Sequence, residues 1–279
     1  MTIMESNLHG IMVPHVPTLL EYGMDNKPSA VVSEMREFGR RMKAWGVTAV
    51  VVATTHWRTG DRFLIDDAPL HRTMTTYAGF RQQVEYDCPG QPELAGILRQ
   101  AGERNLVFTG VERHGADHAV TVPLHFMFPD RDVPVVPLSI AGTPLGAFRW
   151  GRTLGRAIRR WGGKVLFVAS GSLSHDLDCF FVTGRVLPGY EEFDRQMLGL
   201  LAEGKGMDAP GIKPELIGLA KPEGGFRDLF MLLGVLGSRA RGVVRAYEKL
   251  PGVGMAVVEF ADCRESDDEW LVEHDGLVH

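Results

Sequence analysis

Short apolar runs rich in β-branched residues recur along the chain, and they alternate with stretches whose apolar residues fall at helical spacing. The runs lack interspersed polar residues, which is typical of strands buried on both faces of a sheet. We predict strands at residues 8–13, 47–53, 106–111, 133–140 and 165–168, and a last hairpin from residues 243–247 and 255–260.

Helical spacing is clearest before Gly46, which is expected to end the helix. The apolar residues of that stretch are Val31, Met35, Phe38, Met42 and Trp45. Further helices are predicted from residue 92, after a Thr143-Pro144 cap, over residues 190–203, and after residues 222–225, where the apolar face includes Phe226. Strands that alternate with helices indicate an α/β fold with a mostly parallel central sheet flanked by helices.

Some stretches fit neither pattern. Residues 58–90 read as an irregular rim with a short hairpin at 63–65, and residues 204–221 as loop or short helix. Pro123 argues against one continuous helix over residues 114–128. The chain has no internal repeat or linker, so we expect a single domain over residues 1–279, frayed in an acidic tail from about residue 264.

Composition and charge narrow the function classes. A net charge of −5 without a basic stripe gives no reason to expect nucleic acid as a partner. The three cysteines are widely spaced and predict neither a disulfide framework nor a cysteine metal site. We see no signal peptide, and no apolar run approaches the ~20 residues of a membrane span. We therefore expect a soluble protein of the cytoplasm.

Histidines follow several of the predicted strands. The run at 165–168 opens into a Gly/Ser loop that carries His175, and the strands at 47–53 and 8–13 lead to His56 and His15. Ligands of α/β sheets collect outside the carboxyl ends of the strands. If the three strands are neighbours in one sheet, we expect these side chains to converge at that edge.

A metal centre there needs a carboxylate as well. Two imidazoles and one carboxylate form the arrangement that suits non-haem Fe(II), with positions left open for substrate and O₂. Glu223, between Pro222 and a glycine pair, is our candidate, and its alternative role is an N-terminal helix cap. Asp117, Asp176 and Asp178 are rivals by composition.

Five motifs occur in an order that resembles a known family. They are MVPHVPTLL around His15, VVATTHW around His56, DHAVTVPL around His118, VASGSLSHDL around His175, and PEGGFRDLFMLLGVLG from Pro222. Together they resemble the class III extradiol ring-cleavage dioxygenases, the superfamily of the protocatechuate 4,5-dioxygenase catalytic subunit. The likeness is closest to the homoprotocatechuate (3,4-dihydroxyphenylacetate) 2,3-dioxygenase branch and covers most of residues 8–260.

The resemblance implies a role for each matched residue. His15 and His56 match the histidine ligands of Fe(II), and Glu223 matches the carboxylate ligand. His175 matches the histidine that acts as acid and base, and His118 a further histidine near the substrate in many members. His114 and His125 match nothing we can assign, and we weigh and disfavour a zinc pair formed by His114 and His118, because Gly115 and Pro123 argue against the helix it needs.

The implied activity is insertion of both atoms of O₂ into a catechol resembling 3,4-dihydroxyphenylacetate, giving a muconic-semialdehyde-type product. Alternatives are dioxygenases of the same scaffold for 2-aminophenol, protocatechuate or gallate, or dihydroxyphenylpropionate, a zinc-dependent relative acting on a dihydroxyphenylalanine-like substrate, and a metal-binding relative without oxygenase activity. A carboxylated substrate calls for a cation in the pocket, and Arg58, Arg72 and Arg81 lie in the rim, although we expect each to face solvent. We expect a homo-oligomer, with a small second subunit left open.

Overall fold

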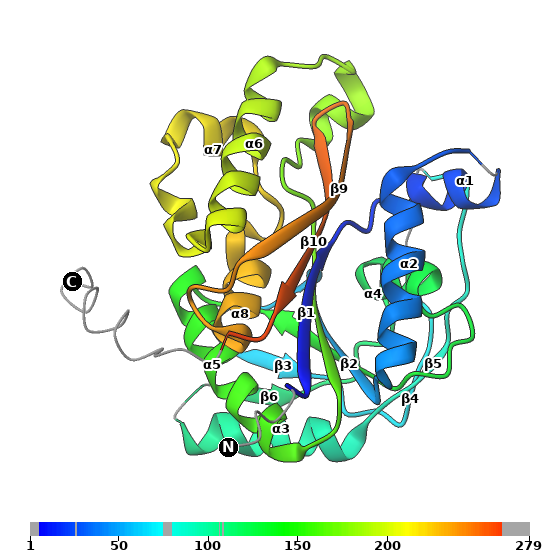
Figure 1. The fold of residues 1–279 in the computed structure, drawn as a ribbon, viewed down its shortest axis with the longest axis vertical. Coiled ribbons are helices and arrows are strands. Elements are labelled where there is room, and N and C mark those ends of the chain that lie inside the picture. Colours follow the sequence, from blue (N-terminus) through cyan, green and yellow to red (C-terminus); the bar gives the residue numbers. More distant parts are fainter. Residues whose placement is uncertain (1–5, 26, 75–79, 106, 108, 264–279) are drawn as a thin grey trace.

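The computed structural model describes residues 6–25, 27–74, 80–105, 107 and 109–263. An eight-stranded sheet with strand order β6-β3-β7-β2-β8-β1-β10-β9 forms its centre (Figure 1). Four adjacent strands are parallel to one another. They are β7 (Val135–Ile140), β2 (Ala49–Arg58), β8 (Val165–Ser170) and β1 (Leu8–Val13). At one edge β10 (Val253–Ala261) runs antiparallel to β1 and to β9 (Gly242–Leu250), which confirms the predicted last hairpin.

Helices cover both faces of the sheet, which confirms the predicted α/β fold (Figure 1). On one face lie α2 (Ala30–Trp45) and α4 (His118–Met127). On the other lie α3 (Pro92–Arg104), α5 (Pro144–Trp161), α6 (Pro188–Glu203) and α8 (Arg227–Leu236). Alternate residues of one strand enter opposite cores, as Val50 and Val51 do, so the buried strands need apolar residues throughout.

Shorter elements connect this framework. They are α1 (Thr18–Met24), α7 (Pro214–Ala220), β3 (Phe63–Ile65), β4 (Leu70–His71), β5 (Cys88–Pro89), β6 (Thr109–Val111), a π-helix at Cys179–Thr183, and 3-10 turns at Gly206–Gly211 and Glu223–Phe226. Within the described ranges, no helix has the length and apolar content needed to cross a bilayer. Residues 106 and 108 of one predicted strand, and the predicted frayed tail, lie outside the described residues.

The structure corrects several expectations. Residues 63–65 do not form a hairpin, because β3 pairs in parallel with β6 and antiparallel with β7. Helix α1 was not predicted; its seven residues directly follow Pro17. Phe226 was expected on the last helix, whereas it adopts a left-handed conformation with φ 66° just before α8.

Residues 114–128 are not one continuous helix, as expected, because α4 begins only at His118. Pro123 is not the reason, however, since it lies inside α4 without interrupting it. A proline inside a helix leaves the carbonyl four residues earlier without its N–H partner. That carbonyl belongs to Ala119, and the Ser170 hydroxyl at the end of β8 donates to it at 2.6 Å. A donor from the neighbouring strand thus replaces the missing helical hydrogen bond.

Close packing of α5 on α8 depends on Gly151. A Cβ there would lie 2.1 Å from the Met231 carbonyl oxygen, so Gly151→Ala is expected to lower the free energy of unfolding by about 1–3 kcal/mol. Gly199→Ala in α6 is the control, because a Cβ there meets nothing within 4 Å and alanine favours a helix by about 0.5–1 kcal/mol. Urea unfolding checks both, and equal stability of the two variants would contradict the expectation.

Candidate metal centre

The strands that precede the three histidines are neighbours. β8 lies between β2 and β1, and Ser170 of β8 pairs with Val13 on one side and Thr54 on the other. The carboxyl ends of the three strands therefore meet at one edge of the sheet. His15 follows β1, His56 lies at the end of β2, and His175 lies in the loop after β8.

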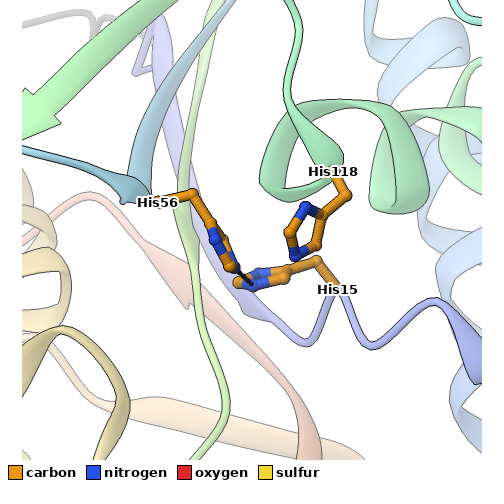
Figure 2. Close-up of side chains that lie close together, drawn as sticks. All are labelled: His15, His56 and His118. Atoms are coloured by element: carbon orange, nitrogen blue, oxygen red, sulfur yellow. Dashed lines mark hydrogen bonds between the residues drawn. The ribbon is translucent and has the colours of Figure 1, made fainter. Parts of the chain in front are cut away.

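Local backbone features aim the first two side chains at each other. Pro14 and Pro17 keep the chain around His15 out of a helix, as predicted. In β2 the register shifts between Thr54 and Arg58, and this irregularity turns His56 toward the sheet edge. The Nε2 atoms of His15 and His56 lie 3.0 Å apart (Figure 2).

Glu223 brings a carboxylate to the same place. Its Oε1 atom lies 3.0 Å from His15 Nε2 and 3.5 Å from His56 Nε2. Thr55 Oγ1 donates to Oε1 at 3.0 Å, and the backbone N–H of Ser172 donates to Oε2 at 2.8 Å. Because α8 begins only at Arg227, Glu223 does not serve as the helix cap that the sequence analysis kept as its alternative.

The rival carboxylates have other partners. Asp117 accepts from the N–H groups of Ala119 and Val120 as the cap of α4. Its Oδ2 atom also accepts from Thr54 Oγ1 and lies 2.7 Å from His114 Nε2. Asp176 accepts from Tyr190 and Lys221, and Asp178 lies beside the same lysine.

His118, the first residue of α4, points toward His15 and His56, so the three imidazoles lie close together (Figure 2). We call the space between these histidines and Glu223 the centre. Its ring lies 3.7 Å from the ring of His56, and the donor atoms of these two histidines and His15 fall within 4.8 Å of one another. Burial, with His15 and His56 adding to it, lowers the pKa of His118 to about 3. This imidazole is therefore neutral near pH 7.

The other histidines of this region have different surroundings. His114 stacks on Trp57 with an interplanar angle of 2° and contacts Asp117, so it supports the cap of α4. His125 packs beside Phe126 near the other end of α4, and burial lowers its pKa. His114 does not belong to the cluster of histidines 15, 56 and 118, whose donor atoms lie within 4.8 Å of one another.

Ser170 determines which ring nitrogen of a neutral His15 carries the hydrogen. Its single hydroxyl hydrogen goes to the Ala119 carbonyl, so its oxygen accepts from His15 Nδ1 at 3.0 Å. A neutral His15 therefore carries its hydrogen on Nδ1 and a lone pair on Nε2. That lone pair faces a carboxylate oxygen of Glu223 at 3.0 Å.

Two such electron-pair donors stay this close only with a positive charge between them. Burial acts to lower the pKa of His15, but the Glu223 carboxylate outweighs it and raises that pKa. The raised pKa means that, without a metal, a proton supplies the positive charge between the two atoms. A metal ion supplies that charge with the right geometry, since donors bound about 2.1 Å from one ion at right angles lie roughly 3 Å apart. The donor set of His15, His56 and Glu223 therefore fits a single divalent metal ion.

His175 lies next to this donor set but is anchored differently. Its Nε2 atom is 3.7 Å from Glu223 Oε1, and its backbone N–H donates to the Ala220 carbonyl at 2.7 Å. Burial lowers the pKa of His175, while the Glu223 carboxylate opposes the shift. The preceding residue is fixed by the buried carboxylate of Asp194, which accepts from both the N–H and the hydroxyl of Ser174.

An apolar cavity of about 350 Å³ opens onto these residues. Its wall includes Phe80, Phe180 and Phe181, and His15, His56, His118, His175 and Glu223 line its base. Such a cavity accommodates one aromatic ring beside a polar centre. None of these phenylalanines was predicted as a site residue: Phe80 belongs to the rim, and Phe180 and Phe181 belong to the π-helix at Cys179–Thr183.

Sequence reasoning also missed buried polar residues around the centre. Besides Ser170 and Thr55, Asp228 at the start of α8 lies behind Glu223, where burial and then the Glu223 charge raise its pKa to about 7. A Cβ on Gly224 would lie 2.6 Å from Asp228 Oδ1, which explains a glycine there, with φ 67°. The contacts of Ser170 and Thr55 join segments far apart in the chain, so motif spacing gives no signal for them, whereas Asp228 lies only five residues after Glu223.

Known proteins resemble this chain over most of its length. Residues 9–258 match the family described as the catalytic LigB subunit of aromatic ring-opening dioxygenase. The chain is 28% identical over 249 residues to a 3,4-dihydroxyphenylacetate 2,3-dioxygenase of Escherichia coli, a match that covers 81% of this chain and 88% of that protein. It is 32% identical over 160 residues to a 4,5-DOPA dioxygenase extradiol of Beta vulgaris, covering 54% of this chain and 57% of that protein.

The fold is shared as well. The crystal structure of the uncharacterized protein JW3007 from Escherichia coli K12 matches with a TM-score of 0.70, covering 91% of this chain and 99% of that chain at 21% identity. The family match and the two relatives confirm the resemblance to the class III extradiol dioxygenases. From the match over residues 9–258, this chain belongs to the LigB family, the catalytic subunits of aromatic ring-opening dioxygenases.

Proposed function

We propose that this protein is an extradiol dioxygenase that opens the ring of a catechol at a single Fe(II) ion held by His15, His56 and Glu223. The observation that carries the proposal is the buried Glu223 carboxylate, 3.0 Å from a histidine nitrogen whose lone pair faces it. Membership of a family of ring-opening dioxygenases supports the reaction class.

Glu223 is a better third ligand than His118. Two imidazoles and one carboxylate suit Fe(II), whereas three imidazoles with one open position suit zinc. Glu223 Oε1 is also within 3.5 Å of both other donor atoms. This assignment leaves the neutral His118 ring, beside the aromatic cavity, to hydrogen-bond a substrate oxygen.

When bound, the ferrous ion would supply the site for the two catechol oxygens and for the activation of O₂. The protein's own groups do the rest. His175, whose Nε2 atom faces the centre, would take the proton of a catechol hydroxyl and return it as the ring opens. The three phenylalanines of the cavity would hold the ring and exclude water.

The substrate we favour is a catechol with a carboxylate side chain, resembling 3,4-dihydroxyphenylacetate. The relative of that name, matched over 88% of its length, supports this choice. We keep a homo-oligomer and a cytoplasmic location as proposals.

Anaerobic loading with Fe(II), followed by addition of O₂ and a panel of catechols and aminophenols, tests the proposal. We expect a yellow ring-opened product and one O₂ consumed per substrate molecule. The same protein loaded with Zn(II) is the control and should give no product. If the iron-loaded protein opens none of these rings, the proposed activity is wrong.

Ser170 offers a test of the centre that does not depend on turnover. Ser170→Ala removes the acceptor that orients His15, so we expect Fe(II) affinity to fall by about 10- to 100-fold in anaerobic titrations. Ser172→Ala is the matched control, because the buried Ser172 hydroxyl has no hydrogen-bond partner within the described part of the chain. Equal affinities for the two variants would contradict the role of Ser170.

A further inference from the structure

A second and larger cavity adjoins the centre. Its volume is about 720 Å³, against about 350 Å³ for the aromatic cavity. The two share His175, Leu177 and Glu223 as lining residues, so a ligand held at the centre can reach into both. The larger cavity differs in character, because its remaining wall includes three cationic side chains, those of Arg58, Lys221 and Arg227.

Local ion pairs neutralise only one of these cations. Lys221 Nζ lies 2.8 Å from Asp176 and 3.5 Å from Asp178. The Glu223 carboxylate faces the histidines instead. Within the described ranges, neither Arg58 nor Arg227 has a carboxylate partner. Asp176, Asp178 and Glu223 balance the formal charge of the wall, but both guanidinium groups remain without a direct ion pair and can accept a carboxylate.

The backbone holds both arginines in place. Arg58 Nε donates to the Thr55 carbonyl at 2.9 Å, and no hydrogen bond to another described residue engages its two terminal nitrogens. Arg227 donates from Nε to the Gly142 carbonyl at 2.6 Å and from Nη1 to the Gly224 carbonyl at 3.0 Å.

The other two arginines of the rim, Arg72 and Arg81, form ion pairs elsewhere. Arg72 pairs with Asp87 at 2.6 Å and Arg81 with Asp25 at 3.1 Å, and neither lines the larger cavity. All three arginines, Arg58, Arg72 and Arg81, were expected to face solvent. Arg58 is exposed, but it is exposed into a cavity beside the centre.

We propose that Arg58 and Arg227 form a subsite for the carboxylate on the side chain of the aromatic substrate. This proposal rests on the proposed ring-opening function, and it identifies Arg58 and Arg227 as the residues that make the protein prefer a carboxylated substrate. A guanidinium fork matches a carboxylate with two parallel hydrogen bonds, and the open terminal nitrogens of Arg58 supply that fork. With its hydroxyls at the centre, the ring would extend its charged chain into the larger cavity.

Anaerobic calorimetry with the Fe(II)-loaded protein tests the subsite without turnover. The probes are 3,4-dihydroxyphenylacetate and the neutral 4-methylcatechol, and the readout is the ratio of their dissociation constants. Arg58→Gln is expected to reduce the preference for the carboxylated ligand by roughly 10- to 100-fold, the range of a hydrogen bond between charged groups. Arg58→Lys should keep part of the preference, because it retains the charge but loses the fork.

Arg72→Gln is the matched control and should leave the ratio unchanged. An unchanged ratio in Arg58→Gln, or an equal loss of affinity for both ligands, overturns the subsite. Ring opening by the wild-type protein separates the two proposals. If the protein opens catechols while Arg58→Gln keeps the ratio, only the subsite is wrong. If it opens none while Arg58→Gln still loses the preference, only the proposed function is wrong.

Discussion

Glu223→Gln is expected to abolish stoichiometric Fe(II) binding while leaving the fold intact. The substitution keeps the shape of the side chain and removes the charge that faces His15 at 3.0 Å. Loss of a residue that only orients a ligand reduces metal affinity by about 10- to 100-fold, so loss of a direct ligand should exceed that range. Iron content after anaerobic loading and desalting, measured by atomic absorption, checks the expectation.

Asp178→Asn is the matched control, since it removes a carboxylate of the neighbouring cavity that pairs with Lys221 rather than with the histidines. It should bind iron like the wild-type protein. If Glu223→Gln keeps a full equivalent of iron, the metal is held by other donors, and the three histidines 15, 56 and 118 become the preferred ligand set. His118→Ala would then lose the metal, which our assignment does not expect.

The position of the candidate site at one edge of the sheet could be predicted from the sequence, because the residue patterns that indicate it are local. Each histidine of the set 15, 56 and 175 follows an apolar strand within a few residues, and strands of this type belong together in one parallel sheet. The adjacency of β2, β8 and β1 then brings the side chains together. The helix ends at Gly46 and at the Thr143-Pro144 cap were predictable for the same reason, because one or two residues determine them.

Errors arose where a distant residue decides the local structure. Pro123 would disfavour a helix on its own, but the Ser170 hydroxyl, far away in sequence, satisfies the freed carbonyl of Ala119. The apolar run at 63–65 suggests a hairpin, yet its partners are β6 and β7. The glycines before Phe226 hide the true start of α8, because the chain makes a left-handed turn there.

The same limit applies to the candidate site. Residues carried by a motif, such as Glu223 after Pro222, could be proposed from the sequence. Ser170 and Thr55 are ordinary small polar residues, and their role follows only from which atoms they contact. Arg58 could not be told from its neighbours in the rim, because the ion pairs that neutralise Arg72 and Arg81 are tertiary contacts.

His175→Ala is expected to keep iron and bind substrate but to lower kcat by roughly 10²- to 10⁴-fold, the usual contribution of a positioned acid–base group. The fold should tolerate the change, because the backbone at this residue is held by the Ala220 carbonyl and by a bridge to Val253 rather than by the imidazole. Iron content, anaerobic substrate affinity and single-turnover rates measure the three effects separately.

His125→Gln is the control for His175→Ala, since His125 lies near the far end of α4, away from both cavities. It should retain the wild-type rate. Normal turnover in His175→Ala would remove this residue from proton transfer. Loss of iron equal to that in Glu223→Gln would instead make His175 a metal ligand, since its Nε2 atom lies 3.7 Å from Glu223 Oε1. A slow enzyme with a full metal site is therefore the result that distinguishes a proton carrier from a fourth ligand.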